Sequence, residues 1–156
     1  MRSVVGTIAA TARSSLLEVR DVLERTERER ALDGTDLDAL VAQVRSAGVE
    51  VHERTEGEPA PLDAASGLAA RRVLQEMLTN ALRHGAHGAP VEVQRLWRAA
   101  DLVIEVANAV GSGGTGGSGA GLQGMRDRVE AVGGSLETDR LGERFIARAR
   151  IPRMPA

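Results

Sequence analysis

The fold of this chain is decided by one stretch, Gln75-Glu76-Met77-Leu78-Thr79-Asn80-Ala81-Leu82-Arg83-His84-Gly85. Because a helix turns by roughly 100° per residue, Glu76, Asn80 and His84 form one polar stripe along it. The neighbouring arc of the same helix is apolar and holds Val73, Leu74, Met77, Leu78, Ala81 and Leu82. Asn80 and His84 therefore lie at the edge of a buried face, where an unpartnered polar group costs about 1–3 kcal/mol. We expect a partner to satisfy them.

A glycine-rich run further along the chain ends in Gly119-Ala120-Gly121-Leu122-Gln123-Gly124-Met125, at the start of a predicted helix. Free amides at a helix N-terminus bind phosphate, so we interpret residues 111–118 as a flexible lid before a phosphate cradle; a plain linker is the alternative. The dinucleotide fingerprint G-x-G-x-x-G matches only weakly, since its first glycine must directly follow a strand. A P-loop is excluded because the chain has no Lys. An acid and an amide on one helix, with this cradle, indicate a nucleotide held with a metal ion.

Length and composition narrow the function classes. The 156 residues fit one domain with an appendage. A net charge of −2 without a basic block gives no electrostatic footprint for nucleic acid. The absence of cysteine excludes disulfides, thiolate metal sites and a cysteine nucleophile. No apolar run approaches the roughly 20 residues of a membrane span, so we expect a soluble chain, whole or cut from a larger membrane protein, that contacts neither nucleic acid nor a membrane.

Hydrophobic periodicity predicts the order of the elements. Residues 1–30 form a predicted helix with Ile8, Leu16, Val19 and Leu23 near one face, which belongs to a coiled coil or helical bundle or else packs on the domain. The rest of the chain predicts helices at 36–47, 63–85 and 122–132, and strands at 49–54, 91–97, 102–107, 135–139 and 143–151. This order is typical of an α+β two-layer sandwich in which helices cover one face of a mixed sheet.

Each polar residue of the stripe also has a structural alternative. Glu76 suits a general base or the ordering of a metal-bound water; its alternative is a solvated carboxylate. The Asn80 amide oxygen suits Mg²⁺ beside phosphate oxygens; its alternative is an amide bonded to backbone. His84, with Arg83 beside it, suits a phosphate; its alternative is a helix-terminal histidine favoured by the dipole. The occurrence of all three in one stripe favours function.

Two motifs resemble those of a known family. Glu76-x-x-x-Asn80-Ala81-x-x-His84 resembles the N-box of the GHKL ATPases, and Gly119-x-Gly121-Leu122-x-Gly124-Met125-x-x-Arg128 resembles their last glycine box. Together with Val129-Glu130-x-x-Gly133-Gly134, they are similar to the catalytic domains of bacterial two-component sensor histidine kinases of the NarL-partner type, over residues 35–152. Leu17-Glu18-Val19-Arg20-x-x-Leu23 resembles the end of the dimerisation helix in such kinases.

The resemblance implies a Bergerat-type fold, with the end of a dimerisation helix at 1–32 and an ATP-binding catalytic domain at 33–156. It implies transfer of the γ-phosphoryl group of ATP, held with Mg²⁺, to a histidine outside this chain. None of His52, His84 and His87 stands on a dimerisation helix before an acidic residue, the context that the family phosphorylates. The implied partners are a cognate response regulator and the protein's own dimerisation and phosphoacceptor domain in a homodimer. The implied location is the cytoplasm, or the cytoplasmic part of a membrane-anchored sensor.

The resemblance also implies a role for each site residue. Glu76 orders water or polarises the phosphoacceptor, Asn80 binds Mg²⁺, and His84 or Arg83 touches phosphate. Backbone approaches the triphosphate at the glycine box, which comprises Gly119, Gly121, Leu122 and Gly124.

The adenine site departs from the family pattern. The middle box is usually Asp-x-Gly-x-Gly, and here Asn108 takes the place of the Asp within Val106-Ala107-Asn108-Ala109-Val110. An amide oxygen still accepts the adenine N–H, but the charge-assisted part of that bond is lost. Two alternatives stay open beside the kinase. The first, which this departure favours, is a non-catalytic nucleotide-binding or dimerisation module. The second is a GHKL serine kinase acting on a partner protein.

Overall fold

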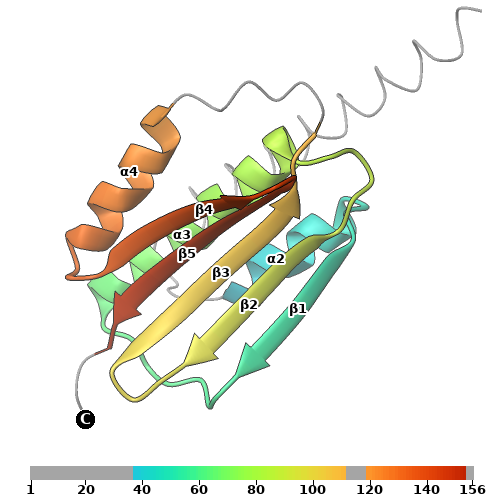
Figure 1. The fold of residues 1–156 in the computed structure, drawn as a ribbon. Helices are drawn as coiled ribbons and strands as arrows, with labels where there is room; N and C mark the ends of the chain where they lie inside the picture. Colours follow the sequence, from blue (N-terminus) through green and yellow to red (C-terminus); the bar gives the residue numbers. More distant parts are fainter. Residues whose placement is uncertain (1–36, 112–118, 154–156) are drawn as a thin grey trace, which may run out of the picture.

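The computed structural model describes residues 37–111 and 119–153, which Figure 1 draws in colour. One five-stranded sheet has the strand order β1-β2-β3-β5-β4. β1 runs parallel to β2, while the other neighbouring strands are antiparallel. The elements are α2 Leu37–Ser46, β1 Val51–Glu56, α3 Ala64–His84, β2 Val91–Trp97, β3 Asp101–Ala109, α4 Gly119–Glu130, β4 Ser135–Leu141 and β5 Arg144–Pro152.

The three described helices share one side of the sheet (Figure 1). α3 packs against β3 and β5 in the middle, α2 lies beside β1, and α4 lies beside β4 and against α3. One hydrophobic core joins residues of all three helices to the inner face of the strands. The predicted fold class, an α+β sandwich with helices on one face of a mixed sheet, is confirmed.

The core follows the periodicities that the sequence predicts. On β3, the alternate residues Leu102, Ile104 and Val106 are buried against the helices. The buried arc of α3 includes Val73, Leu74, Met77, Leu78 and Ala81. Full burial of an aliphatic side chain stabilises a fold by about 1.5–3 kcal/mol. Packing of this arc therefore fixes the direction in which the polar stripe of α3 points.

The two ends of α3 are defined by different capping residues, Asp63 and Gly85. Asp63 is the N-cap: its carboxylate accepts from the Ser66 N–H at 2.9 Å and from the Ser66 hydroxyl at 3.0 Å. These hydrogen bonds, the backbone one first, lower the pKa of the Asp63 carboxyl. Gly85 ends the helix where the sequence predicts, but its backbone is extended (φ −69°, ψ 156°) rather than left-handed. Glycine is needed there for space, because a β-carbon would lie 2.3 Å from the Ala81 carbonyl oxygen.

Several predicted boundaries differ from the structure; β3 and β4, for example, each end two residues later than predicted, at Ala109 and Leu141. β1 spans Val51–Glu56 rather than 49–54. α4 begins at Gly119 rather than Leu122, so Gly119 and Gly121 lie in the helix instead of the preceding loop. The low helix propensity of glycine favours its placement outside helices. The cost of one glycine in a helix interior is nevertheless only about 1 kcal/mol relative to alanine. The fully buried Met125 and Val129 anchor α4 strongly enough to outweigh this cost.

Some predictions fall outside the described residues. These are the helix at 1–30, the domain division at residue 32 and residues 112–118 of the lid. Within the described part of the chain, no helix is long and apolar enough to cross a membrane.

Candidate functional site

The polar stripe of α3 occupies the predicted place on its helix. Glu76, Asn80 and His84 are all partly buried and flank the buried arc. Among residues 37–111 and 119–153, no side chain forms a hydrogen bond or an ion pair with any of the three. Burying polar groups is favourable only when they are hydrogen-bonded. The stripe is therefore suited to meet groups that another molecule brings.

The acidic end of the stripe faces the start of α4. A β-carbon built on Gly121 would lie 3.4 Å from Glu76 Oε1, so the carboxylate lies against the first turn of α4. The first N–H groups of a helix have no partner within it, and they carry a partial positive charge. This arrangement places a carboxylate beside the N-terminus of a helix, a position whose free N–H groups suit an anionic ligand.

The glycines of α4 are not explained by packing within the described chain. A β-carbon on Gly119 or on Gly124 would meet nothing within 4 Å. Neither residue has a left-handed φ, so alanine fits both positions in the described structure. Since glycine weakens a helix relative to alanine, the open space beside these glycines fits the close approach of a ligand.

Asn108 lies at the opposite end of the stripe, near the end of β3. Its side chain is almost buried, and its Nδ2 donates to the Ala109 carbonyl oxygen at 3.1 Å. The Asn108 oxygen Oδ1 therefore remains an acceptor. A β-carbon on Gly85 would lie 3.3 Å from Asn108 Nδ2, so the end of α3 closes directly over this amide.

Backbone hydrogen bonds join the C-terminal end of α3 to the end of β3. The Ala86 N–H donates to the Ala109 carbonyl oxygen at 2.7 Å, and the Gly111 N–H donates to that of His84 at 3.2 Å. An isolated bridge also joins Gly85 to Val110. The stripe therefore runs from the start of α4, beside Glu76, to the amide of Asn108.

Two other predicted residues are less constrained. Arg83 is exposed in the last turn of α3, and Leu122 packs partly buried against the core. No group of three or more His, Asp or Glu residues in the described ranges is placed to hold a metal ion. A magnesium ion at Asn80 would therefore take most of its oxygen ligands from the bound molecule and from water.

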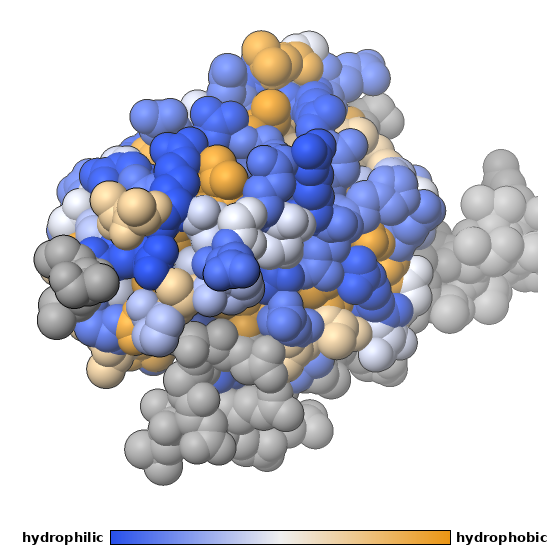
Figure 2. All heavy atoms as spheres, turned by 90° about the horizontal axis from the view of Figure 1, so that it is seen from below, coloured by the Kyte–Doolittle hydropathy of each residue, from blue (hydrophilic) through white to orange (hydrophobic). Residues whose placement is uncertain are grey.

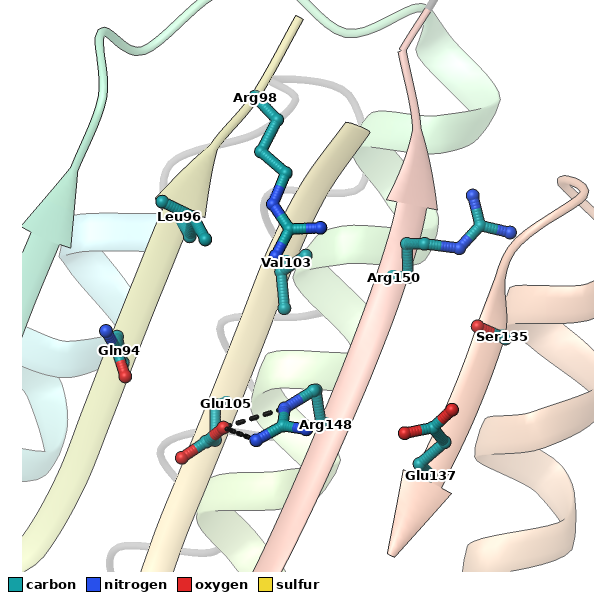
Figure 3. A pocket seen from close by; sticks show the side chains of 9 residues that line it. All are labelled: Gln94, Leu96, Arg98, Val103, Glu105, Ser135, Glu137, Arg148 and Arg150. Carbon is teal, nitrogen blue, oxygen red and sulfur yellow. Dashed lines mark hydrogen bonds and ion pairs between the residues drawn. The ribbon is translucent and has the colours of Figure 1, made fainter. Parts of the chain in front are cut away.

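A hollow of about 530 Å³ lies on the face of the sheet opposite the three described helices (Figure 3). It contains none of the predicted residues. Arg148 donates to Glu105 from Nε at 2.8 Å and from Nη2 at 2.6 Å, and this pairing raises the pKa of the guanidinium. The two residues are direct neighbours in the register of β3 and β5. The sequence did not predict this hollow. Glu105 and Arg148 face each other only because β3 and β5 are neighbours in the sheet, and that strand order cannot be read from the sequence pattern.

Sequence comparison finds two relatives, both from Bacillus subtilis. The sensor histidine kinase YxjM is 33% identical over 140 residues, which cover 85% of this chain and 33% of that protein. The sensor histidine kinase DesK is 29% identical and covers 85% of this chain and 36% of that protein. The chain thus spans about a third of the length of the relatives it matches. No protein-family model matches the chain.

Solved structures share the fold. A histidine kinase from Burkholderia phymatum has a TM-score of 0.62 at 18% identity, covering 97% of this chain and 86% of that one. The histidine kinase domain of a blue-light activated kinase from Erythrobacter litoralis has a TM-score of 0.56 at 21% identity, covering 96% and 83%. Histidine kinase ThkA, solved in complex with the response regulator TrrA, has a TM-score of 0.61 at 15% identity, covering 89% and 48%. The fold is that of histidine kinase catalytic domains.

Proposed function

We infer that the chain belongs to the sensor histidine kinases, as the GHKL ATP-binding catalytic domain of the NarL-partner type. One observation supports this most directly. Glu76, the first residue of the stripe Glu76–Asn80–His84, faces the glycine-rich start of α4, on a fold shared with histidine kinase catalytic domains. The proposed reaction is transfer of the γ-phosphoryl group of ATP to a histidine outside this chain. Phosphoryl transfer of this kind relies mainly on positioning and charge stabilisation.

Each residue of the stripe has a proposed task at the phosphates. Glu76, beside the first turn of α4, polarises the acceptor or a water. The Asn80 amide oxygen would hold Mg²⁺, which when bound neutralises phosphate charge. His84 and Arg83 contact phosphate from the C-terminal end of α3. Gly119, Gly121, Leu122 and Gly124 give the phosphates access to backbone N–H groups.

Asn108 is the proposed reader of the base. Its Nδ2 is occupied by the Ala109 carbonyl, which leaves Oδ1 as the acceptor for an exocyclic amino group such as that of adenine. Without a carboxylate, this bond lacks charge assistance. We therefore expect a dissociation constant for ATP of tens of micromolar or weaker, since each tenfold loss corresponds to about 1.4 kcal/mol.

The wider context of the protein is part of the same proposal. A response regulator is the proposed recipient of the phosphoryl group, and a phosphoacceptor and dimerisation domain in a homodimer is the proposed first acceptor. The cytoplasm is the proposed location. The solved complex of ThkA with a response regulator supports such a partner.

Asn108 favours a second candidate, a nucleotide-binding module without turnover. Phosphoryl transfer separates the two. The chain is incubated with radiolabelled ATP, Mg²⁺ and a separately produced phosphoacceptor domain, and acid-labile phosphate on that domain is measured. Transfer confirms the kinase. Saturable ATP binding without transfer to any supplied acceptor supports the binding module, and absence of ATP binding contradicts both.

A further inference from the structure

The hollow on the sheet face opposite the described helices has the size of a ligand site (Figure 3). Its volume of about 530 Å³ falls within the roughly 300–1,000 Å³ of small-ligand sites. None of the residues proposed for the nucleotide site lines it. Its walls are outward-facing side chains of β2, β3, β4 and β5, together with Arg98 just after β2. Charge is distributed unevenly among these side chains.

One end of the hollow is acidic. In the register of the sheet, Arg148 stands between Glu105 on β3 and Glu137 on β4. Its guanidinium donates twice to Glu105, at 2.8 and 2.6 Å, so these two charges match each other. Glu137 adds a further negative charge beside this pair. This end therefore repels an anion.

The other end of the hollow is basic. Arg150 stands between Val103 on β3 and Ser135 on β4, so its row across the sheet contains no carboxylate. Asp101 is the only carboxylate within 4 Å of Arg150 in the described part of the chain, at 3.9 Å. Arg98 lies 4.0 Å from the same carboxylate. Two guanidiniums therefore share one acidic partner, and one positive charge is unmatched.

The two arginines have free hydrogen-bonding capacity. Their contacts with Asp101 are too long for hydrogen bonds, and half-exposed ion pairs of this kind contribute little to stability. The side chains of Arg98 and Arg150 are 55% and 45% exposed. Arg150 also donates to the Gly133 carbonyl oxygen, at 3.5 Å. Because a guanidinium carries five N–H groups, most donors of both residues remain open to a ligand.

An apolar floor adjoins the basic end. Leu96 on β2 and Val103 on β3 are direct neighbours in the register, and both are partly exposed. Figure 3 shows the Arg98 side chain extending from the end of β2 over Val103. A flat apolar group placed on this floor would also contact the plane of a guanidinium, which stacks well on aromatic rings.

We propose that this hollow binds a small organic molecule with one carboxylate and a flat apolar body. Arg98 and Arg150 hold the carboxylate, a group that matches the N–H geometry of arginine, and the body lies on Leu96 and Val103. The negative end of the hollow disfavours ligands with several anionic groups. This site is separate from the proposed nucleotide site and does not depend on the proposed function.

The adjoining surface favours a small ligand over a broad protein partner. The end of the molecule that carries the turn between β2 and β3 is mostly hydrophilic, with separate hydrophobic patches rather than one apolar face (Figure 2). Broad partner sites usually expose a contiguous apolar area.

A titration with phenylpropionate, followed by ligand-observed NMR, tests the site in the full chain. Binding should saturate at one site with millimolar affinity or tighter, as expected for so small a ligand. The double variant Arg98→Gln and Arg150→Gln should bind at least tenfold more weakly. The control Arg140→Gln and Arg144→Gln changes the same charge at exposed positions outside the hollow and should bind as wild type. Equal affinity in all three proteins, absence of binding, or displacement by Mg-ATP would overturn the proposal.

Two further measurements separate a carboxylate site from a merely apolar or merely basic surface. Phenylpropionamide, which has the same shape without the charge, should bind at least tenfold more weakly than phenylpropionate. Asp101→Asn should strengthen phenylpropionate binding about threefold, because the carboxylate that competes for both guanidiniums is gone. The control Asp139→Asn, at an exposed position of β4 outside the hollow, should leave affinity unchanged. Equal affinity for amide and acid, or equal effects of the two Asp variants, would overturn the proposal.

Discussion

The carboxylate of Glu76 faces Gly121, with 3.4 Å between Glu76 Oε1 and the position of a β-carbon on that glycine. The acid belongs to α3 and the glycine to the first turn of α4, so two motifs that are distant in sequence meet at one place. Because Gly121 has no side chain, a ligand can approach its backbone, and the Glu76 carboxylate lies beside it as a candidate proton acceptor.

Glu76→Gln should abolish phosphoryl transfer while sparing folding and ATP binding, because the side chains are nearly isosteric and only the charge and the base are lost. General-base groups contribute about 10²–10⁴-fold, and the transfer rate should fall by that amount. Rates are measured with a supplied phosphoacceptor domain. Glu130→Gln, at an exposed position on α4, is the control. Transfer by Glu76→Gln at the wild-type rate would make Glu76 a surface carboxylate.

Asn80→Ala should weaken ATP binding only when Mg²⁺ is present. Loss of one ligand to the ion should cost about tenfold in affinity, or 1.4 kcal/mol. A fluorescent ATP analogue is titrated with Mg²⁺ and with EDTA, and Asn80→Asp is measured alongside. His87→Ala, in the exposed loop after α3, should bind as wild type. Equal affinities of all variants in Mg²⁺ would remove Asn80 from the site.

Gly124→Ala should have opposite effects on stability and on binding. Its new β-carbon meets nothing within 4 Å, and alanine favours a helix over glycine by about 1 kcal/mol. The free energy of unfolding in urea should therefore rise, while ATP affinity should fall because the methyl group occupies the ligand's space. The reverse change at an exposed site of α2, Ala42→Gly, should lower stability without affecting affinity. Unchanged ATP binding in Gly124→Ala would show that nothing approaches this glycine.

Gly134→Ala should destabilise the junction between α4 and β4. A β-carbon there would lie 2.2 Å from the Arg150 carbonyl oxygen and 2.6 Å from Val129 Cγ1. Overpacking of this kind costs about 1–3 kcal/mol, measured as a lower free energy of unfolding in urea. Gly142→Ala meets no atom within 4 Å but has a φ of +61°, so it reports backbone strain alone. An unchanged free energy of unfolding in Gly134→Ala would contradict the close packing around Gly134.

Stability should depend on the ionisation of Asp63. Hydrogen bonds from Ser66 lower the pKa of this carboxyl from 3.8. Since the folded pKa lies below the unfolded one, the stabilisation is complete above the unfolded value and is lost as pH falls through the folded pKa. Asp63→Ala should therefore be less stable than wild type at neutral pH, and the gap should narrow in strong acid. A gap of constant size across urea titrations from neutral to acidic pH would contradict this assignment.

The sequence predicts those features that depend on local periodicity. The buried arc of α3, its cap at Asp63 and the alternation of β3 follow from patterns within one element. Features that depend on strand order were not predicted. Arg95 is nearly buried because its alternation places it on the inner face, yet its partners Asp38 and Glu53 come from two other elements. The start of α4 at Gly119 likewise depends on packing rather than on propensity.

The candidate site divides in the same way. The spacing of Glu76, Asn80 and His84 fixes their common face, and the structure confirms that the three lie together beside the buried arc. The closeness of Asn108 to Gly85 could not be derived, because it depends on hydrogen bonds between the loop after α3 and the end of β3. The catalytic, magnesium and base-reading roles of these residues stay predictions until the variants are measured.

The parallel pairing of β1 with β2 has a consequence for folding kinetics. α3 is the crossover between these strands, so the helix that carries the polar stripe is also the segment whose ends must be brought together. Non-local pairing of this kind is slow to form and limits the folding rate, because the entropy of loop closure is lost before the contacts are gained. Substitutions that weaken the β1–β2 register, such as Val93→Ala on the inner face of β2, should therefore slow refolding of the whole domain while leaving the chemistry of the assembled site intact.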